Sequence, residues 1–277
     1  MIEEDKINEI MPLKRLIICL ITLFLVLPLV SFTNNSNIPP NRIRTIVIDA
    51  GHGGKFPGAA GKYSREKDVT LKVALLLGKA IEEKMKDVKV VYTRIIDKQF
   101  AADTPKDLKY RIDMANREKA DLLISIHCNS AGPGPSRTLV KGVETFVAGS
   151  ERLKEQDAAL KQYAALEEEY KIEETAPSDP AGAIMLSMLR NSLREQSVRL
   201  ATFVQDEYVA TGRVNRGVQE LSLAVLRTAT MPAILTEIGF ISNPEEEDYI
   251  NSEIGQNEIV TCLLRAIQAY KKQAELE

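Results

Sequence analysis

Four residues carry side chains that could together bind a metal ion and move a proton: His52, Glu66, His127 and Glu237. The chain has only two histidines, and each closes an apolar, β-branched run, TIVIDAGH or LLISIH. Glu237 lies inside another apolar run, PAILTEIGF, where an unpaired buried carboxylate would cost several kcal/mol. Glu237 therefore needs a cation, a metal or hydrogen-bond donors beside it.

Two imidazoles and one carboxylate form a ligand set that catalytic zinc takes, leaving a fourth position for water. The metal lowers the pKa of that water to about 7, and a further carboxylate then accepts the proton and returns it to the leaving group. Glu66 fits the role of the ligand, and Glu237 fits the role of the proton carrier. Each residue alone has a structural alternative: a hydrogen-bonded histidine, a helix-dipole partner at Glu66, or a bond from Glu237 to the backbone or Asn243.

The elements that position these residues follow from the periodicity of apolar residues. Strands alternate with helices along the chain, which predicts an α/β fold with a parallel or mixed sheet, whose carboxyl edge is where ligands bind. Ser64 is expected to cap the first helix, and Thr104, Pro105 and Asp107 form a predicted capping box for the second. The predicted strands are 44–50, 88–93, 121–127, 142–148 and 233–238, with 218–227 as a short strand or loop. The predicted helices are 65–86, 104–119, 181–209, a short helix after Pro244, and 255–274.

The amino terminus has the pattern of a secretory signal. Lys14 and Arg15 precede the apolar run Leu16 to Val30, and small and polar residues follow. We predict a signal peptide over 1–33, with Met11 as the natural start, and a linker over 34–43; an uncleaved signal anchor is the alternative. Cleavage would leave no stable membrane span and place the protein in the cell envelope. The net charge of -3 gives no reason to expect a nucleic-acid partner.

The four residues lie in motifs that resemble the zinc-dependent N-acetylmuramoyl-L-alanine amidases of the amidase 3 family. The motifs are TIVIDAGHGG, the glutamate in SREKDVTL, LLISIHCNS and MPAILTEIGFISNPEE, and the resemblance covers about residues 44–272. It implies a three-layer α/β/α sandwich with a mixed, largely parallel sheet, as a single domain over 44–274.

By matching motif positions, the resemblance implies that one Zn²⁺ per chain is bound by His52, Glu66 and His127, with Glu237 as the catalytic glutamate. The implied reaction is hydrolysis of the peptidoglycan amide between the lactyl group of N-acetylmuramic acid and L-alanine, in wall turnover or daughter-cell separation. Asn129 either contacts the substrate or stabilises a turn. Two alternatives remain: a zinc peptidase acting on wall peptides, and a non-catalytic wall-binding protein of the same fold.

Residues 150–180 form an acidic insertion with a weak helical stripe. One interpretation is a solvated surface helix. The other comes from the resemblance: some family members that act in cell division carry a helix here that covers the zinc site. Glu167, Glu168 and Glu169 are the candidates for an autoinhibitory ligand, and a protein activator would displace residues 150–177. Such a protein would be periplasmic or associated with the wall.

Overall fold

One sheet organises the structure. The computed structural model of the 277-residue chain describes residues 42–149, 153–166 and 180–276. Its six strands follow the order β2-β1-β3-β6-β4-β5. Strands β2, β1, β3 and β6 are parallel, and β4 is antiparallel to β6 and parallel to β5. The bounds are β1 Thr45–Ala50, β2 Lys89–Tyr92, β3 Leu122–Asn129, β4 Val143–Ala148, β5 Asn215–Leu221 and β6 Ala233–Phe240. The predicted mixed, largely parallel sheet is confirmed.

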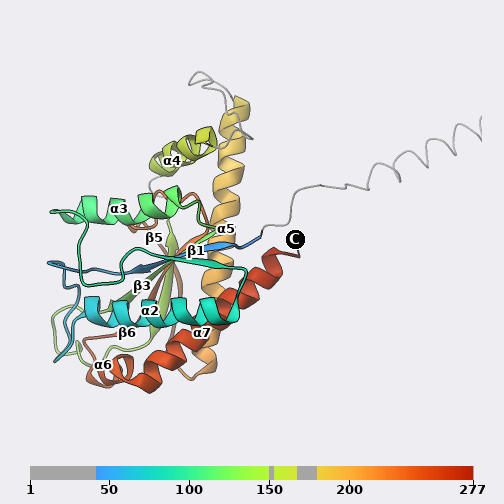
Figure 1. The fold of residues 1–277 in the computed structure, drawn as a ribbon. Coiled ribbons are helices and arrows are strands. Elements are labelled where there is room, and N and C mark those ends of the chain that lie inside the picture. The colour runs from blue at the N-terminus through green and yellow to red at the C-terminus, as the bar shows by residue number, and fades with distance from the viewer. Residues whose placement is uncertain (1–41, 150–152, 167–179, 277) are drawn as a thin grey trace, which may run out of the picture. The chain divides into compact units, whose positions relative to one another are not determined.

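Helices cover both faces of the sheet (Figure 1). Helices α2 and α7 lie on one side together with α5, which packs against α7 and β4, and α3 lies on the other side. Helix α4 packs on α5 through a small cluster of Leu160, Leu186 and Leu193. The bounds are α2 Glu66–Lys84, α3 Thr104–Arg117, α4 Leu153–Leu166, α5 Pro180–Ala210, α6 Pro244–Asn251 and α7 Glu253–Ala274. This is the predicted three-layer α/β/α arrangement.

The apolar runs of the sequence become strands that are buried on both faces. In β1, Ile46 and Ile48 face the larger core with α2, α5 and α7, whereas Val47 faces a second core with α3. This alternation follows from the two-residue period of a strand. The second core is completed by the segment after β5, which contributes Val225 and Leu226.

Two helix starts differ from the sequence prediction. The N-cap of α2 is Arg65, which makes no side-chain cap. The hydroxyl of Ser64, the predicted cap, donates instead to Glu247 of α6 at 2.7 Å. The N-cap of α3 is Asp103, whose carboxylate accepts from the Lys106 amide at 3.0 Å. Asp107, the other side chain of the predicted capping box, accepts from the Phe100 amide and from Arg111 of the same helix. Local capping signals were therefore wrong at both positions.

The described residues contain no candidate membrane span and no disulfide. Within the described part of the chain, none of the helices has both the length and the apolar character needed to cross a membrane. Cys128 and Cys262, whose pairing the sequence left open, are both buried free thiols. The predicted signal peptide, residues 1–33, lies outside the described residues.

Candidate metal centre and active site

The topology of the sheet brings the four predicted residues to one edge. His52 lies two residues after the end of β1, and His127 and Glu237 lie near the carboxyl ends of β3 and β6. Strand β3 is the parallel neighbour of both β1 and β6, and the register pairs His127 with Glu237. Glu66 is the first residue of α2. The carboxyl ends of parallel strands share one edge of the sheet. His52 and Glu237, which are 185 positions apart in the sequence, therefore line one cavity.

The Glu66 carboxylate bridges the two imidazoles. Its Oε2 lies 3.1 Å from His52 Nε2, and its Oε1 lies 2.8 Å from His127 Nδ1. The centroids of the two imidazole rings are 5.0 Å apart, and the ring planes make an angle of 73°. Potential ligand atoms of the three residues all lie within 4.8 Å of one another. The backbone amides of Ala59 and Cys128 also donate to Glu66, at 2.7 and 3.0 Å. Glu66 is thus held in place from both sides.

Glycines allow the backbone to approach these side chains. A Cβ atom at Gly51 would lie 2.5 Å from the His127 ring, and one at Gly58 would lie 2.4 Å from Glu66 Oε2. Gly58 also has a φ of +69°, in the left-handed region that glycine adopts without steric cost. Any side chain at either position would occupy the space of a predicted ligand.

The electrostatics of the site favour charged Glu66 and protonated Glu237. Burial would raise the pKa of Glu66, but hydrogen bonds and charge attraction from His127 and His52 hold it well below its ordinary value. Burial would lower the pKa of His127, but the Glu66 and Glu237 carboxylates raise it above its ordinary value. Burial raises the pKa of Glu237 to about 8; His127 opposes this shift, and Glu66 and Glu144 add to it.

The site opens into a cavity of about 330 Å³. Its lining includes the apolar side chains of Phe146, Leu223 and Val225 as well as His52, His127 and Glu237. Oε2 of Glu237 is buried without a hydrogen-bond partner among the described residues. The donor set, the glycines that make room for it and this unpartnered oxygen all fit a zinc ion with water beside it.

Asn243 and Asn129 both make hydrogen bonds to nearby backbone amides. Asn243, a predicted partner of Glu237, instead caps α6 by accepting from the Glu245 and Glu246 amides. Asn129 lines the cavity, and its Oδ1 accepts from the Ser130 amide at 2.7 Å while its Nδ2 donates to Glu144. These bonds match the turn-stabilising role, and one amide N–H remains for a substrate.

Sequence reasoning missed Glu144. This carboxylate is buried in β4, where the antiparallel register places it directly opposite Glu237. It accepts from Asn129 and lies 3.5 Å from Arg216 Nε. The signal that singled out Glu237, an acid inside an apolar strand, is equally present in VETFVA. The same physical criterion would have found both residues.

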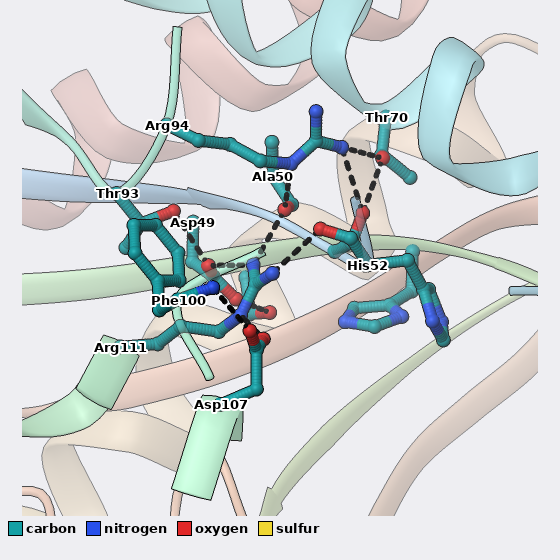
Figure 2. A network of polar contacts seen from close by, with 12 residues as sticks. Asp49, Ala50, His52, Thr70, Thr93, Arg94, Phe100, Asp107 and Arg111 are labelled. Atoms are coloured by element: carbon teal, nitrogen blue, oxygen red, sulfur yellow. Dashed lines mark hydrogen bonds and ion pairs between the residues drawn. The ribbon is translucent and has the colours of Figure 1, made fainter. Parts of the chain in front are cut away.

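Sequence reasoning also missed a buried polar network below the His52 turn (Figure 2). Asp49 and Arg111 form an ion pair at 2.8 Å with both side chains 1% exposed. Burial would raise the pKa of Asp49, but Arg111 and the hydroxyls of Ser125 and Thr93 lower it to about 2. A buried aspartate at the end of β1 was a detectable signal for this network, because such a charge requires a partner.

The acidic insertion is described only in part. Helix α4 contacts the segment after β5, where Gln156 donates to the Ala229 carbonyl at 3.5 Å and Glu155 pairs with Arg227 at 3.2 Å. The cavity at His52 and Glu237 has no lining residue from the described part of the insertion. Glu167, Glu168 and Glu169 lie outside the described residues.

An α/β sheet with two imidazoles, a bridging carboxylate and a second buried carboxylate at its carboxyl edge is suited to metal-dependent hydrolysis. The sequence profile of Amidase_3, described as N-acetylmuramoyl-L-alanine amidase, matches residues 46–269, so the chain belongs to this family.

Similar proteins share most of the chain. It is 30% identical over 239 residues to N-acetylmuramoyl-L-alanine amidase AmiC of Escherichia coli O6:H1, covering 81% of this chain and 52% of that protein. The chain thus spans about half the length of this relative. The crystal structure of N-acetylmuramoyl-L-alanine amidase from Clostridium difficile 630 is 29% identical, with a TM-score of 0.61 over 83% of this chain and 98% of that one. The catalytic domain of the amidase CwlV from Bacillus (Paenibacillus) polymyxa is 27% identical, with a TM-score of 0.58 over 83% and 98%.

Proposed function

We propose that this protein is an N-acetylmuramoyl-L-alanine amidase of peptidoglycan, which hydrolyses the amide between the lactyl group of N-acetylmuramic acid and L-alanine. One Zn²⁺ per chain would be held by His52, Glu66 and His127. The observation that carries the proposal is the convergence of these three side chains, from three separate segments, to within 4.8 Å beside Glu237. Membership of the Amidase_3 family supports the choice of substrate.

The roles of the chain's own residues follow from their positions. A zinc ion held by His52, Glu66 and His127 would act as a Lewis acid for the amide carbonyl and would lower the pKa of bound water. Burial, together with the nearby Glu66 and Glu144 carboxylates, raises the pKa of Glu237 to about 8, and a dication bound beside it would favour its ionised form. Glu237 then accepts a proton from the attacking water and gives it to the departing L-alanine amine. Phe146 and Val225 give the same cavity an apolar lining beside these groups.

Digestion of purified peptidoglycan, followed by mass spectrometry of the products, tests this proposal. An amidase releases intact stem peptides with a free L-alanine amino group and leaves glycan strands that keep the lactyl carboxylate. A chelator should abolish release. Fragments cut inside the stem peptide would instead identify a zinc peptidase, and binding without products would identify a non-catalytic wall-binding protein.

We further propose that the protein acts outside the cytoplasm and that residues 150–177 restrain it. The support is the signal-like pattern of residues 1–33 and the acidic composition of the insertion. Glu167, Glu168 and Glu169 are the proposed autoinhibitory residues, and an activator protein would displace the segment. A folded variant lacking 150–177 should digest peptidoglycan faster than the full chain. Unchanged or lower activity would contradict the restraint.

Amino-terminal sequencing of the protein from the cell envelope would test the cleavage after residue 33.

A further inference from the structure

The turn that carries His52 is held by side chains of other elements (Figure 2). Three consecutive carbonyls, at Ala50, Gly51 and His52, accept hydrogen bonds from two buried guanidinium groups. Arg94 donates to Ala50 and Gly51, both at 2.9 Å. Arg111 donates to Ala50 at 2.7 Å and to His52 at 2.5 Å. The conformation of the turn therefore depends on residues more than forty positions away.

The backbone of His52 is unusual and needs such support. Its φ is +62°, and Lys119 is the other non-glycine residue with a positive φ in the described part of the chain. Residues with a Cβ atom adopt this region at a steric cost and keep it only where surrounding contacts fix it. At His52, the contact that reaches its own carbonyl comes from Arg111. This backbone conformation sets the direction in which the imidazole leaves the turn.

Arg111 itself cannot move freely. Its Nε donates to Asp107 at 2.9 Å and its Nη1 to Asp49 at 2.8 Å. Asp49 is fixed in turn by the hydroxyls of Thr93 and Ser125, both at 2.7 Å. The planar guanidinium makes all these bonds at once through its fork of donors, which a lysine ammonium cannot reproduce.

We propose that Arg111 is a positioning residue for the metal centre: it holds the His52 backbone in the conformation that presents the imidazole beside Glu66. The inference rests on the metal site of the proposed function. Residues that orient metal ligands typically change metal affinity by about 10–100-fold when they are replaced. Arg111 would act in this way through the backbone of the ligand.

Zinc affinity, measured by competition with a chromogenic chelator, tests the proposal independently of turnover. Arg111→Lys should weaken zinc binding by about 10–100-fold and should alter the visible spectrum of the Co²⁺-loaded protein. The matched control is Thr93→Val, which removes one hydroxyl from the same network and leaves the contact between Arg111 and His52. It should lower thermal stability while its zinc affinity stays within about threefold of the original protein, because no contact to the His52 turn is lost.

A second variant covers the case in which Arg111→Lys does not fold. Asp107→Asn keeps the arginine but weakens the bond that fixes its Nε, so zinc affinity should fall by a smaller factor, below the roughly 10-fold lower bound for removal. The proposal is overturned if a folded Arg111→Lys protein keeps the original zinc affinity and Co²⁺ spectrum, or if the Asp107 variant keeps the original affinity. It is also overturned if Thr93→Val loses as much affinity as Arg111→Lys. If the original protein binds zinc through Arg111-dependent geometry yet cleaves no amide, the proposed function fails and this inference stands.

Discussion

Replacing Glu247 by glutamine is expected to destabilise the loop that leads into Glu66. Glu247 lies on α6 and is 1% exposed. Its carboxylate accepts from three consecutive backbone amides, of Lys62 at 2.7 Å, Tyr63 at 2.9 Å and Ser64 at 2.8 Å, and from the Ser64 hydroxyl. These bonds fix residues 62–64, two positions before the predicted ligand.

The magnitude follows from the hydrogen bonds that glutamine cannot accept. Glutamine offers one oxygen, so at least one backbone N–H would face an NH₂ group, which costs about 1–3 kcal/mol. The remaining bonds lose the assistance of the negative charge, so the total is about 3 kcal/mol. For a chain of this size, that corresponds to a fall in Tm of about 6–12 °C.

Thermal unfolding at two pH values is the assay. Burial would raise the pKa of Glu247, but its bonds to the amides of residues 62–64 lower it. Its stabilising contribution is therefore fully present above the pKa of an unfolded glutamate, about 4.3, and is lost as the pH falls through the lower folded value. The Tm difference between the two proteins should be large at pH 7 and should shrink below about pH 4.

The matched control is Asp248→Asn on the same helix. Asp248 is exposed and contacts the same loop through the Tyr63 hydroxyl at 2.9 Å. Its replacement should change the free energy of unfolding by less than about 0.5 kcal/mol. A Tm of Glu247→Gln within about 1 °C of the original protein, or an equal loss of stability in Glu247→Gln and Asp248→Asn, would show that the Glu247 carboxylate does not stabilise this loop.

Three further predictions concern the active site and the network below it. Glu237→Ala should retain zinc and lose turnover by about 10²–10⁴-fold, as measured by metal analysis and stem-peptide release; release at the original rate would contradict its role. Asp49→Asn breaks a buried ion pair and should destabilise by about 3–5 kcal/mol in urea unfolding at pH 7; because the pKa of Asp49 is about 2, the difference should narrow only as the pH falls from about 4 to 2. Gly58→Ala should weaken zinc binding by about 10-fold or more, since its Cβ would lie 2.4 Å from Oε2 of Glu66, the proposed ligand, whereas Gly132→Ala, with open space around its Cβ, should bind zinc normally.

The sheet and the site residues that lie on its strands were accessible from the sequence for one physical reason, whereas Glu66, at a helix start, was assigned from its family motif. Strands buried on both faces are nearly continuous apolar runs, so a polar residue such as His127 or Glu237 within or at the end of one is conspicuous. Parallel neighbours then bring such residues to a common edge. The order of elements predicted the fold class, and the structure confirms it.

The supporting residues were harder to predict because their partners are distant in sequence. Arg111 lies on an amphipathic helix, where an arginine is normally solvated, and only the structure shows it buried against Asp49, 62 positions away. Ser64 carries a capping signal but bonds to Glu247, 183 positions away. The positive φ of His52 has no local sequence cause, since glycine rather than histidine is expected there.

The most direct test of the account is a zinc titration of the chelator-stripped protein, with release of stem peptide from a defined muropeptide as the readout. If His52, Glu66 and His127 hold one catalytic ion, activity should be absent at the start, rise linearly and reach its maximum at one Zn²⁺ per chain. The His127→Ala protein should stay inactive at the same zinc concentrations. Full activity in the metal-free protein, or a maximum reached only at two ions per chain, would contradict the account.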